Sequence, residues 1–245
     1  MHELKGRRAL VTGANRGLGR RISLRLARAG AQVILGVRDP RRAEPVRDEI
    51  ATTHGTGGGA EIQALDLADF ASIARAGEEI RSRHRALHVL INNAGVRFHD
   101  GDRDLDGLTP EILSRTMTVN AMGPLMLIRE MLPLLRASGS AHVVNVGSDM
   151  ADLKDMEGRS HAYRLSKLVL HGMTLNLAAE LAADGVRVSG FDPGWMKTAM
   201  GGPDATEDPE ISADGLLATV CLPPDRPSGK IWWREALPSP ILDYP

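Results

Sequence analysis

Short apolar runs rich in β-branched residues alternate along the chain with longer segments in which apolar residues recur at helical spacing. Most of the short runs are apolar at nearly every position, which is typical of strands buried on both faces of a parallel sheet. The runs that we expect to form strands are Ala9–Thr12, Ala31–Val37, Glu61–Leu65, Leu87–Ile91, His142–Val146, Val186–Phe191 and Lys230–Trp233. The pattern predicts an α/β fold: a doubly wound parallel sheet of about seven strands with helices on both faces.

Signals for the start of a helix lie between these runs. Asp39-Pro40 and Thr109-Pro110 each place a capping side chain before a first-turn proline. The apolar positions between Leu18 and Ala29 form one stripe, which predicts a helix with a single buried face. No repeat, linker or change of composition divides the chain, so we expect one domain over residues 1–245.

Composition and charge narrow the classes of protein. The chain is 42% hydrophobic and 25% charged, with a net charge of −1, which gives no electrostatic case for binding nucleic acid or an anionic membrane. A single cysteine, Cys221, excludes an internal disulfide. No apolar run approaches the roughly 20 residues of a membrane span, and a strand-like run begins too early for a signal peptide. We therefore expect a soluble, cytoplasmic protein.

A glycine-rich turn joins the first expected strand to the first expected helix, with the sequence Thr12-Gly13-Ala14-Asn15-Arg16-Gly17-Leu18-Gly19. Its three glycines permit a tight turn and a close approach of the backbone to a ligand, while the start of the helix favours an anion. Such a turn alone is weak evidence, but its place between a strand and a helix indicates dinucleotide binding. No Gly-Lys-Ser/Thr follows, so it is not a triphosphate-binding loop.

Tyr163 and Lys167 lie four residues apart, and Tyr163 comes fifteen residues after Ser148. In a helix this spacing puts both side chains on one face, so the ammonium group lies beside the phenol. A neighbouring cation would lower the pKa of the tyrosine from about 10 toward the working range of an acid–base catalyst. The same spacing also arises by chance, so the pair alone does not establish catalysis.

The chain resembles the short-chain dehydrogenase/reductase family nearly from end to end, as a carbonyl-reductase-like member. The residues that carry this resemblance, in the family's order, are Thr12–Gly19, Asp66, Asn92–Gly95, Asn120, Ser148, Tyr163, Lys167, Pro193-Gly194 and Thr198. The resemblance implies a Rossmann-type dinucleotide-binding domain and an NAD(P)-dependent oxidoreductase. The chain departs from the family at Gly147, where a second serine is common, and at Ser189–Asp192 before Pro193.

The resemblance also implies catalytic roles for Asn120, Ser148, Tyr163 and Lys167. Tyr163 would protonate the carbonyl oxygen of the substrate, and Lys167 would lower the tyrosine pKa and bond the nicotinamide ribose. Ser148 would hold the carbonyl oxygen, and Asn120 would position a water that links Lys167 to solvent. Two alternatives stay open: Ser148 as a strand-end or helix-cap hydroxyl, and Asn120 as a buried amide that satisfies an irregularity in a helix.

The same resemblance implies a set of residues that contact the cofactor. These are Gly13, Asn15, Arg16, Gly17, Leu18, Gly19, Arg38, Asp66, Leu67, Asn93, Ala94, Gly95, Tyr163, Lys167, Pro193, Gly194 and Thr198. Asp66 would accept a hydrogen bond from the adenine amino group, although an aspartate at a strand end is often a helix cap.

The end of the second expected strand bears on the choice of cofactor. Val37 stands where NAD-preferring relatives commonly carry aspartate, and Arg38 follows it. Together with Arg16, Arg38 would bind the 2′-phosphate of NADP through charge-assisted hydrogen bonds. Asp39 argues for NAD, but an aspartate before Pro40 is more simply a helix cap. We therefore expect NADP(H) rather than NAD(H).

The substrate is less well defined by the sequence. The loops that build the family's pocket offer Phe98, Asp149, Met150, Trp195, Met196 and Met200. The methionines and the tryptophan indicate an apolar, adaptable pocket for a bulky small-molecule carbonyl compound. His84 and His88 fall on a helix end and a strand, so we expect no metal site.

Three functions stay open at this point. The leading hypothesis is an NADPH-dependent carbonyl reductase; the alternatives are an NADP-dependent alcohol dehydrogenase working oxidatively and a non-catalytic dinucleotide sensor. The stretch Ile112–Leu135 is apolar around much of its circumference. This surplus of apolar surface predicts a homodimer or homotetramer.

Overall fold

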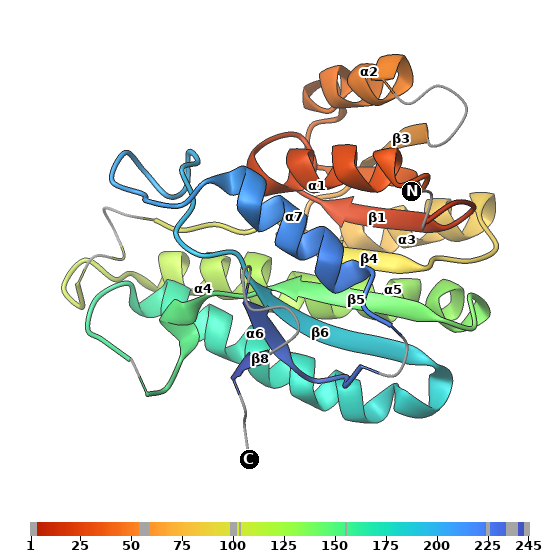
Figure 1. Ribbon diagram of the computed structural model, residues 1–245. Coiled ribbons are helices and arrows are strands. Elements are labelled where there is room, and N and C mark those ends of the chain that lie inside the picture. The colour runs from red at the N-terminus through yellow and green to blue at the C-terminus, as the bar shows by residue number, and fades with distance from the viewer. Residues whose placement is uncertain are drawn as a thin grey trace.

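A single twisted sheet forms the centre of the computed structural model, which describes residues 4–53, 59–98, 102, 104–154, 156–223, 226–233 and 240–242 (Figure 1). The strand order is β3-β2-β1-β4-β5-β6-β7-β8. The strands are β1 (Arg8–Thr12), β2 (Gln32–Val37), β3 (Gly59–Ala64), β4 (Val89–Asn92), β5 (Ala141–Val146), β6 (Val186–Asp192), β7 (Ile231–Trp233) and β8 (Pro240–Leu242). The first seven strands are parallel, which confirms the predicted sheet.

The short strand β8 is an addition that the hydrophobic pattern did not predict. It pairs antiparallel with β7 and forms one edge of the sheet. Three residues that include Pro240 carry neither the length nor the apolar run of a buried strand, so this edge depends on pairing with β7.

Helices cover both faces of the sheet (Figure 1). On one face lie α1 (Gly17–Arg28), α2 (Glu44–Thr53) and α7 (Pro209–Val220), and their apolar side chains pack on Ala9, Val11, Val33 and Leu35 from the first two strands. On the other face lie α3 (Phe70–Arg83), α5 (Gly123–Ala137) and α6 (His161–Glu180), which pack on Leu10, Ile34, Leu90 and Val143. Alternate residues of one strand thus belong to two separate cores.

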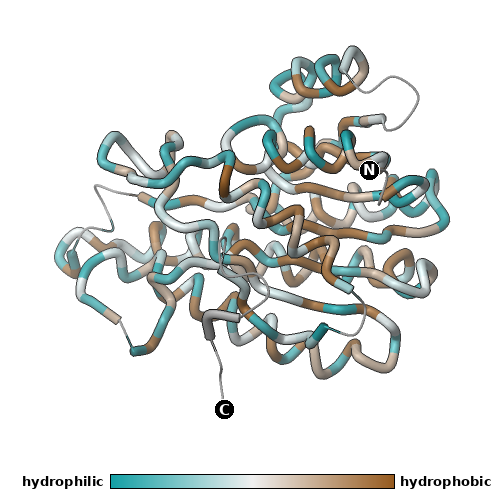
Figure 2. The backbone as a smooth tube through the Cα atoms, in the orientation of Figure 1, coloured by the Kyte–Doolittle hydropathy of each residue, from teal (hydrophilic) through white to brown (hydrophobic). Residues whose placement is uncertain are grey.

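The local signals for helix starts produce the caps that they predict. The Asp39 carboxylate accepts a hydrogen bond from the amide of Arg41 and caps the 3-10 turn Pro40–Arg42. The Thr109 hydroxyl accepts one from Ile112 and caps α4 (Pro110–Met117). Hydrophobic residues lie along the central strands of the sheet (Figure 2). No helix within the described ranges is both long and apolar enough to cross a membrane.

The apolar stretch Ile112–Leu135 is not one regular helix. Between α4 and α5 the backbone forms a π-helical turn, Thr118–Met122, that contains Asn120. Turns of this kind occur often at functional sites. The periodicity of the apolar residues continues through the π-helical turn, so the sequence pattern did not predict this turn.

The connections place the functional segments at one end of the sheet. The chain runs from β1 to one neighbour, β2, and later returns to β4 on the other side of β1. In a doubly wound sheet, ligands bind outside the carboxyl ends of the strands where the direction of winding reverses. This reversal between β1 and β4 is therefore where the fold predicts a binding site.

Candidate active site

A cavity of about 1150 Å³ lies at the carboxyl ends of the strands. Segments that follow β1, β2, β3, β4, β5 and β6 line it, together with the first turn of α6. Its volume exceeds the several hundred Å³ of a typical small-molecule site. It therefore has room for a dinucleotide and a small substrate together.

The glycine-rich turn after β1 forms one end of this cavity. Gly13 and Gly17 have φ angles of +67° and +56°, in the left-handed region that favours glycine. A Cβ atom on Gly19 would lie 2.3 Å from the carbonyl oxygen of Gly13, so Gly19 serves close packing and does not itself line the cavity. No side chain caps the start of α1, which leaves its first amides for a ligand. This turn fits a pyrophosphate.

Thr12 ties the glycine-rich turn to the segment after β4. Its hydroxyl accepts hydrogen bonds from the amides of Asn93 (3.0 Å) and Ala94 (2.9 Å). The side-chain amide of Asn93 donates in return to the carbonyl oxygen of Thr12, at 2.8 Å. These bonds bring Asn93, Ala94 and Gly95 to the cavity wall.

Arg16 and Arg38 line the same end of the cavity, and both are exposed. Among the described residues, neither guanidinium group has an ion-pair partner. Asp39 does not compete for them: Arg41 donates to its carboxylate and lowers its pKa. Two cations without an ion-pair partner in the described ranges, Arg16 before α1 and Arg38 after β2, are suited to a phosphate group.

Asp66 and Leu67 also line the cavity, after β3. One carboxylate oxygen of Asp66 accepts a hydrogen bond from the amide of Ala68, at 2.9 Å. The residue that caps α3 is Asp69, whose carboxylate accepts from Ala71. Asp66 therefore does not have the helix-cap role that was its alternative.

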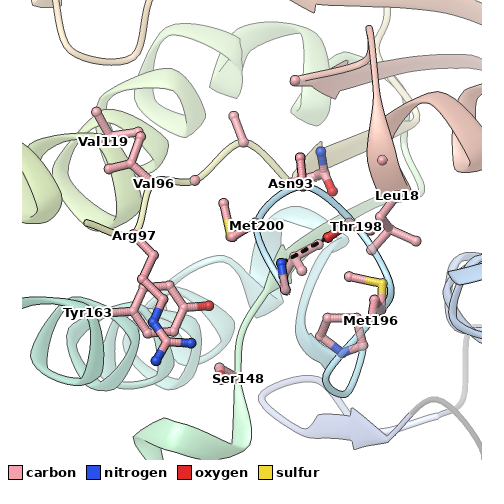
Figure 3. Close-up of a pocket in the computed structure, with 18 of the residues that line it drawn as sticks. Leu18, Asn93, Val96, Arg97, Val119, Ser148, Tyr163, Met196, Thr198 and Met200 are labelled. Carbon is pink, nitrogen blue, oxygen red and sulfur yellow. Dashed lines mark hydrogen bonds between the residues drawn. The ribbon is translucent and has the colours of Figure 1, made fainter. Parts of the chain in front are cut away.

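Ser148, Tyr163 and Lys167 all line the other end of the cavity, which we call the catalytic end. Figure 3 shows Ser148 and Tyr163 there. Ser148 follows β5, and its hydroxyl donates to Asp149 (3.1 Å) and accepts from the amide of Met150. Lys167 is buried and donates from Nζ to the carbonyl oxygen of Val146, at 2.7 Å. Its Nζ lies 5.7 Å from the centre of the Tyr163 ring.

The pKa of Tyr163 departs from the value that the spacing predicted. Burial and the carboxylate of Asp192 raise the pKa of Tyr163 to about 12, whereas the Arg97 guanidinium and a hydrogen bond with Ser148 lower it. The prediction that Lys167 would lower this pKa was wrong for the chain as it stands. The spacing of Tyr163 and Lys167 gives no information about burial, which has the largest effect on this pKa. Tyr163 is thus a protonated phenol at neutral pH.

Lys167 and Asp192 form a buried pair of ionisable groups. Burial lowers the pKa of Lys167 to about 8, against the influence of Asp192. Burial also raises the pKa of Asp192 to about 7, although the amide of Gly194 donates to its carboxylate at 2.9 Å. Asp192 belongs to the segment in which the chain departs from the family, so the departure places a carboxylate that acts on Lys167.

Asn120 lies in the π-helical turn, buried beneath the cavity wall. Its side-chain oxygen accepts from the amide of Val96 (2.8 Å), and its side-chain nitrogen donates to Val96 (2.9 Å) and to Ser166 (3.0 Å). Gly95 lies between Asn120 and Lys167, since a Cβ on it would be 3.3 Å from Asn120 and 3.8 Å from the lysine Nζ. The part of Asn120 in positioning a water stays a prediction.

His171 explains the glycine at position 147. A Cβ on Gly147 would lie 2.3 Å from Nε2 of the His171 ring, so the imidazole occupies the space of the serine that is common in the family. His171 is buried, and burial together with Lys167 lowers its pKa to about 4. A neutral imidazole at this place adds no positive charge next to the lysine.

Asp102 is a residue of the site that the sequence analysis missed. Its buried carboxylate accepts hydrogen bonds from the amides of Ala162 (2.8 Å) and Tyr163 (2.9 Å) at the start of α6. The cap position itself, Ser160, has a φ angle of +52° and makes no side-chain cap bond. The Asp102 carboxylate therefore caps α6, the helix that carries Tyr163 and Lys167, and no local sequence signal predicts this.

Arg97 is the second missed residue. Its guanidinium carbon lies 5.4 Å from the centre of the Tyr163 ring, and its Nη2 donates to the hydroxyl of Ser160 at 3.0 Å (Figure 3). Only its place two residues after the Asn92–Gly95 motif could have drawn attention to it.

The expected substrate residues divide into two groups. Asp149, Met150, Trp195, Met196 and Met200 line the cavity. Phe98 is not among the described residues that line it, and its place in the substrate pocket stays a prediction.

The catalytic end is also more charged than the methionines and the tryptophan predicted. Arg97, Arg159 and Lys197 line it alongside the apolar residues.

The histidines that raised the question of a metal have separate partners. His84 bonds Glu61 at 2.5 Å, and His88 accepts from the amide of Arg8 at 3.0 Å. Within the ranges that the structure describes, no group of three or more His, Cys, Asp or Glu residues could hold a metal ion.

Residues 7–209 match the family described as short chain dehydrogenase. The chain is 34% identical over 217 residues to retinol dehydrogenase 14 of Mus musculus, which covers 81% of this chain and 64% of that protein. It is 33% identical over 215 residues to the rhamnolipids biosynthesis 3-oxoacyl-[acyl-carrier-protein] reductase of Pseudomonas aeruginosa, with 86% and 81% covered. The chain thus spans less than two thirds of the length of some relatives.

Solved structures of similar proteins have the same architecture. The NADPH-bound carbonyl reductase from chicken fatty liver superposes with a TM-score of 0.84 at 29% identity, covering 95% of this chain and 98% of that one. A metagenomic short-chain oxidoreductase in complex with NADP gives a TM-score of 0.77 at 30% identity, covering 91% and 94%.

Proposed function

The chain belongs to the short-chain dehydrogenase family, and on that premise we propose that it is an oxidoreductase that reduces a ketone or aldehyde to an alcohol with NADPH. The observation that carries the proposal is the convergence of Ser148, Tyr163 and Lys167 in one cavity with the glycine-rich turn. A structural role for any one of them would not require all three to face the same space.

The chain's own residues supply the proton and hold the reacting oxygen. Tyr163 is protonated at neutral pH, since its pKa lies well above 7. It would give its proton to the carbonyl oxygen, which the Ser148 hydroxyl would hold. A bound NADPH would supply the hydride that adds to the carbonyl carbon. Proton and hydride together convert the carbonyl to an alcohol and leave the oxidised cofactor.

The remaining residues of the site would hold the cofactor. The pyrophosphate would lie against the glycine-rich turn, where Gly13, Asn15, Gly17 and Leu18 line the cavity. Gly19 would let α1 approach it closely. Asp66, Leu67 and Asn93–Gly95 would line the adenosine, and Pro193, Gly194 and Thr198 the nicotinamide. Lys167 would bond the nicotinamide ribose, and Asn120 keeps its predicted role in linking Lys167 to solvent.

Arg16 and Arg38 favour NADP(H) over NAD(H). Both line the cavity, and no residue in the described ranges neutralises either of them. A 2′-phosphate carries nearly two negative charges and would bond both, whereas a ribose hydroxyl would leave them without a partner. The NADPH and NADP named for two similar structures agree with this preference.

We propose reduction as the direction to assay. At neutral pH Tyr163 carries the proton that reduction of a carbonyl group consumes. An oxidative alcohol dehydrogenase is the alternative function, in which the same tyrosine would accept the proton.

A panel of ketones and aldehydes with NADPH, followed by the absorbance of the reduced nicotinamide, tests the proposal. We expect turnover of at least one carbonyl compound that exceeds the reverse reaction at neutral pH. NADPH binding without turnover of any compound would indicate a dinucleotide sensor instead.

We further propose that the protein is a homodimer or homotetramer. Four large apolar side chains near the junction of the π-helical turn with α5 and along α6 are exposed: Met122 (48%), Leu125 (40%), Leu165 (47%) and Val169 (44%). Burying such a patch against a second copy removes it from water. Light scattering at micromolar concentration should give at least twice the mass of the chain, and a monomeric mass would contradict this.

A further inference from the structure

Arg97 brings a positive charge to the catalytic end of the cavity. Its side chain descends from the segment after β4, and the guanidinium group lies against the ring of Tyr163 (Figure 3). Arg97, Tyr163 and Ser148 all line the same cavity. A substrate whose carbonyl group reaches Tyr163 therefore passes beside this arginine.

Most of the hydrogen-bonding capacity of Arg97 is unused. A guanidinium group has five N–H donors. In the described part of the chain its one hydrogen bond is from Nη2 to the Ser160 hydroxyl, and its Nε is buried without a partner. No acidic side chain there forms an ion pair with it.

The neighbouring Arg164 shows what a satisfied arginine looks like at this place. It is buried, and it donates to the carbonyl oxygens of Arg159 (3.2 Å) and Met150 (3.0 Å) and pairs with Glu157 at 3.2 Å. The acidic residue Asp149 is likewise engaged, by the Ser148 hydroxyl and the amide of Met150. Among the described residues, Asp149 and Glu157 therefore have partners, and none of the acidic groups forms an ion pair with Arg97.

The backbone before α6 has an unusual conformation that places the hydrogen-bond partner of Arg97. Arg159 and Ser160 both have positive φ angles, of 73° and 52°, which residues with side chains seldom adopt. Such strain persists only where the surroundings impose it, and it gathers at functional sites. Here it sets the Ser160 hydroxyl where it accepts from Arg97.

We propose that Arg97 binds an anionic group of the substrate, so that the enzyme prefers carbonyl compounds that also carry a carboxylate. The inference rests on the proposed function and adds the class of substrate to it. A carboxylate would accept two parallel charge-assisted hydrogen bonds from the free side of the guanidinium group. It would also neutralise a partly buried cation, which is costly to leave without a partner.

A matched pair of substrates tests this preference: 4-oxopentanoate and its methyl ester, which differ in one negative charge. With NADPH and the full chain, kcat/KM should be at least about tenfold higher for the acid, mainly through a lower KM. Arg97→Gln should abolish this advantage, so that kcat/KM becomes equal for the acid and the ester. Arg97→Lys, which keeps the charge but loses the paired donors, should restore part of it.

Arg75→Gln provides the control for the loss of one positive charge. Arg75 is exposed on α3, outside the cavity, and should keep the parent's ratio between acid and ester. Thermal unfolding of each variant establishes that it is folded. If Arg97→Gln fails to fold, Arg97→Lys and Arg97→Met carry the same comparison.

Several results would overturn the inference. An equal loss for acid and ester in Arg97→Gln, with a shifted pH profile, would mean that Arg97 acts only through the pKa of Tyr163. Equal kcat/KM for the two substrates in the parent would also refute it, while turnover of the ester would leave the proposed function intact.

If no carbonyl compound is turned over, the proposed function fails, and calorimetric titration of 4-oxopentanoate into the NADP-bound protein decides the inference. Binding to the parent and not to Arg97→Gln supports it. Equal binding to both, or to neither, overturns it.

Discussion

Arg16 and Arg38 are exposed at the end of the cavity that the glycine-rich turn forms, which we call the cofactor end. At the catalytic end, in contrast, Lys167 and Asp192 are buried. An exposed charge costs little on folding because water solvates it, so it is available to a ligand without loss of stability. A buried charge costs stability, and its pKa shifts in consequence, as it does for Lys167 and Asp192. The comparison indicates that changes at the cofactor end should alter affinity alone, and changes at the catalytic end should alter stability and rate.

The largest expected effect on stability is at Asp192. Because burial raises its pKa from 3.8 to about 7, its contribution to stability is fully present below about pH 4 and is lost as the pH rises through 7. Asp192→Asn keeps an acceptor for Gly194 and removes the charge. It should raise the free energy of unfolding at pH 8 by up to about 4 kcal/mol, and the gain should vanish toward pH 4.

Urea unfolding of the parent and Asp192→Asn at pH 8 and pH 4.5 checks this. Lys167 and Asp149 are the charged groups that act on Asp192. A variant less stable than the parent at pH 8 would show that the attraction between Asp192 and Lys167 outweighs the cost of burial.

At the cofactor end, Arg38→Asp should invert the preference from NADPH toward NADH. Losing one charged hydrogen bond weakens NADPH by roughly ten- to a hundredfold, and the new carboxylate repels the phosphate and accepts from the ribose hydroxyl. Arg16→Ala should weaken NADPH without helping NADH, since it supplies no acceptor. Both residues are exposed, so the free energy of unfolding should change by less than about 0.5 kcal/mol.

Kinetics with both cofactors decide this prediction. If Arg38→Asp leaves the ratio of activity with NADPH to activity with NADH unchanged, or if the parent already prefers NADH, then Arg38 does not bind a 2′-phosphate. The family membership of the chain would be unaffected.

A smaller effect is expected at Asp102, which joins the loop after β4 to the catalytic helix. Asp102→Ala removes the acceptor of the Ala162 and Tyr163 amides, and should cost about 1–2 kcal/mol of stability and about tenfold in kcat. Asp102→Asn keeps one acceptor and should recover most of the rate. Urea unfolding and kcat measured together separate the two effects; a loss of stability with an unchanged kcat would show that Asp102 does not position Tyr163.

The sequence predicts those parts of the molecule whose signals are contiguous. The seven parallel strands follow from apolar runs, and the caps at Asp39 and Thr109 follow from the dipeptides with proline. The glycine-rich turn is likewise a contiguous signal, because the strand before it and the helix after it are its neighbours in the sequence. The strand β8 has no such run, because its place depends on a partner strand.

The catalytic end is less predictable because distant segments assemble it. Asp102 reaches α6 across 61 residues of chain to Tyr163, and Arg97 reaches Ser160 across 63. The pKa of Tyr163 rises because of burial and of Asp192 on β6, neither of which the Tyr163–Lys167 spacing contains. Nothing in the sequence pairs Gly147 with His171 either, since only the packed structure brings them into contact.

Tyr163→Phe tests the central claim most directly, because it removes one hydroxyl from the catalytic end and nothing from the cofactor end. Cofactor affinity, from the fluorescence of bound NADPH, and turnover of the best carbonyl substrate should be measured on the same preparation. We expect a Kd for NADPH within about twofold of the parent and a kcat lower by about a hundredfold or more. A kcat within about threefold of the parent would contradict the assignment of Tyr163 as the acid, and a matching fall in NADPH affinity would contradict the separation of the two ends.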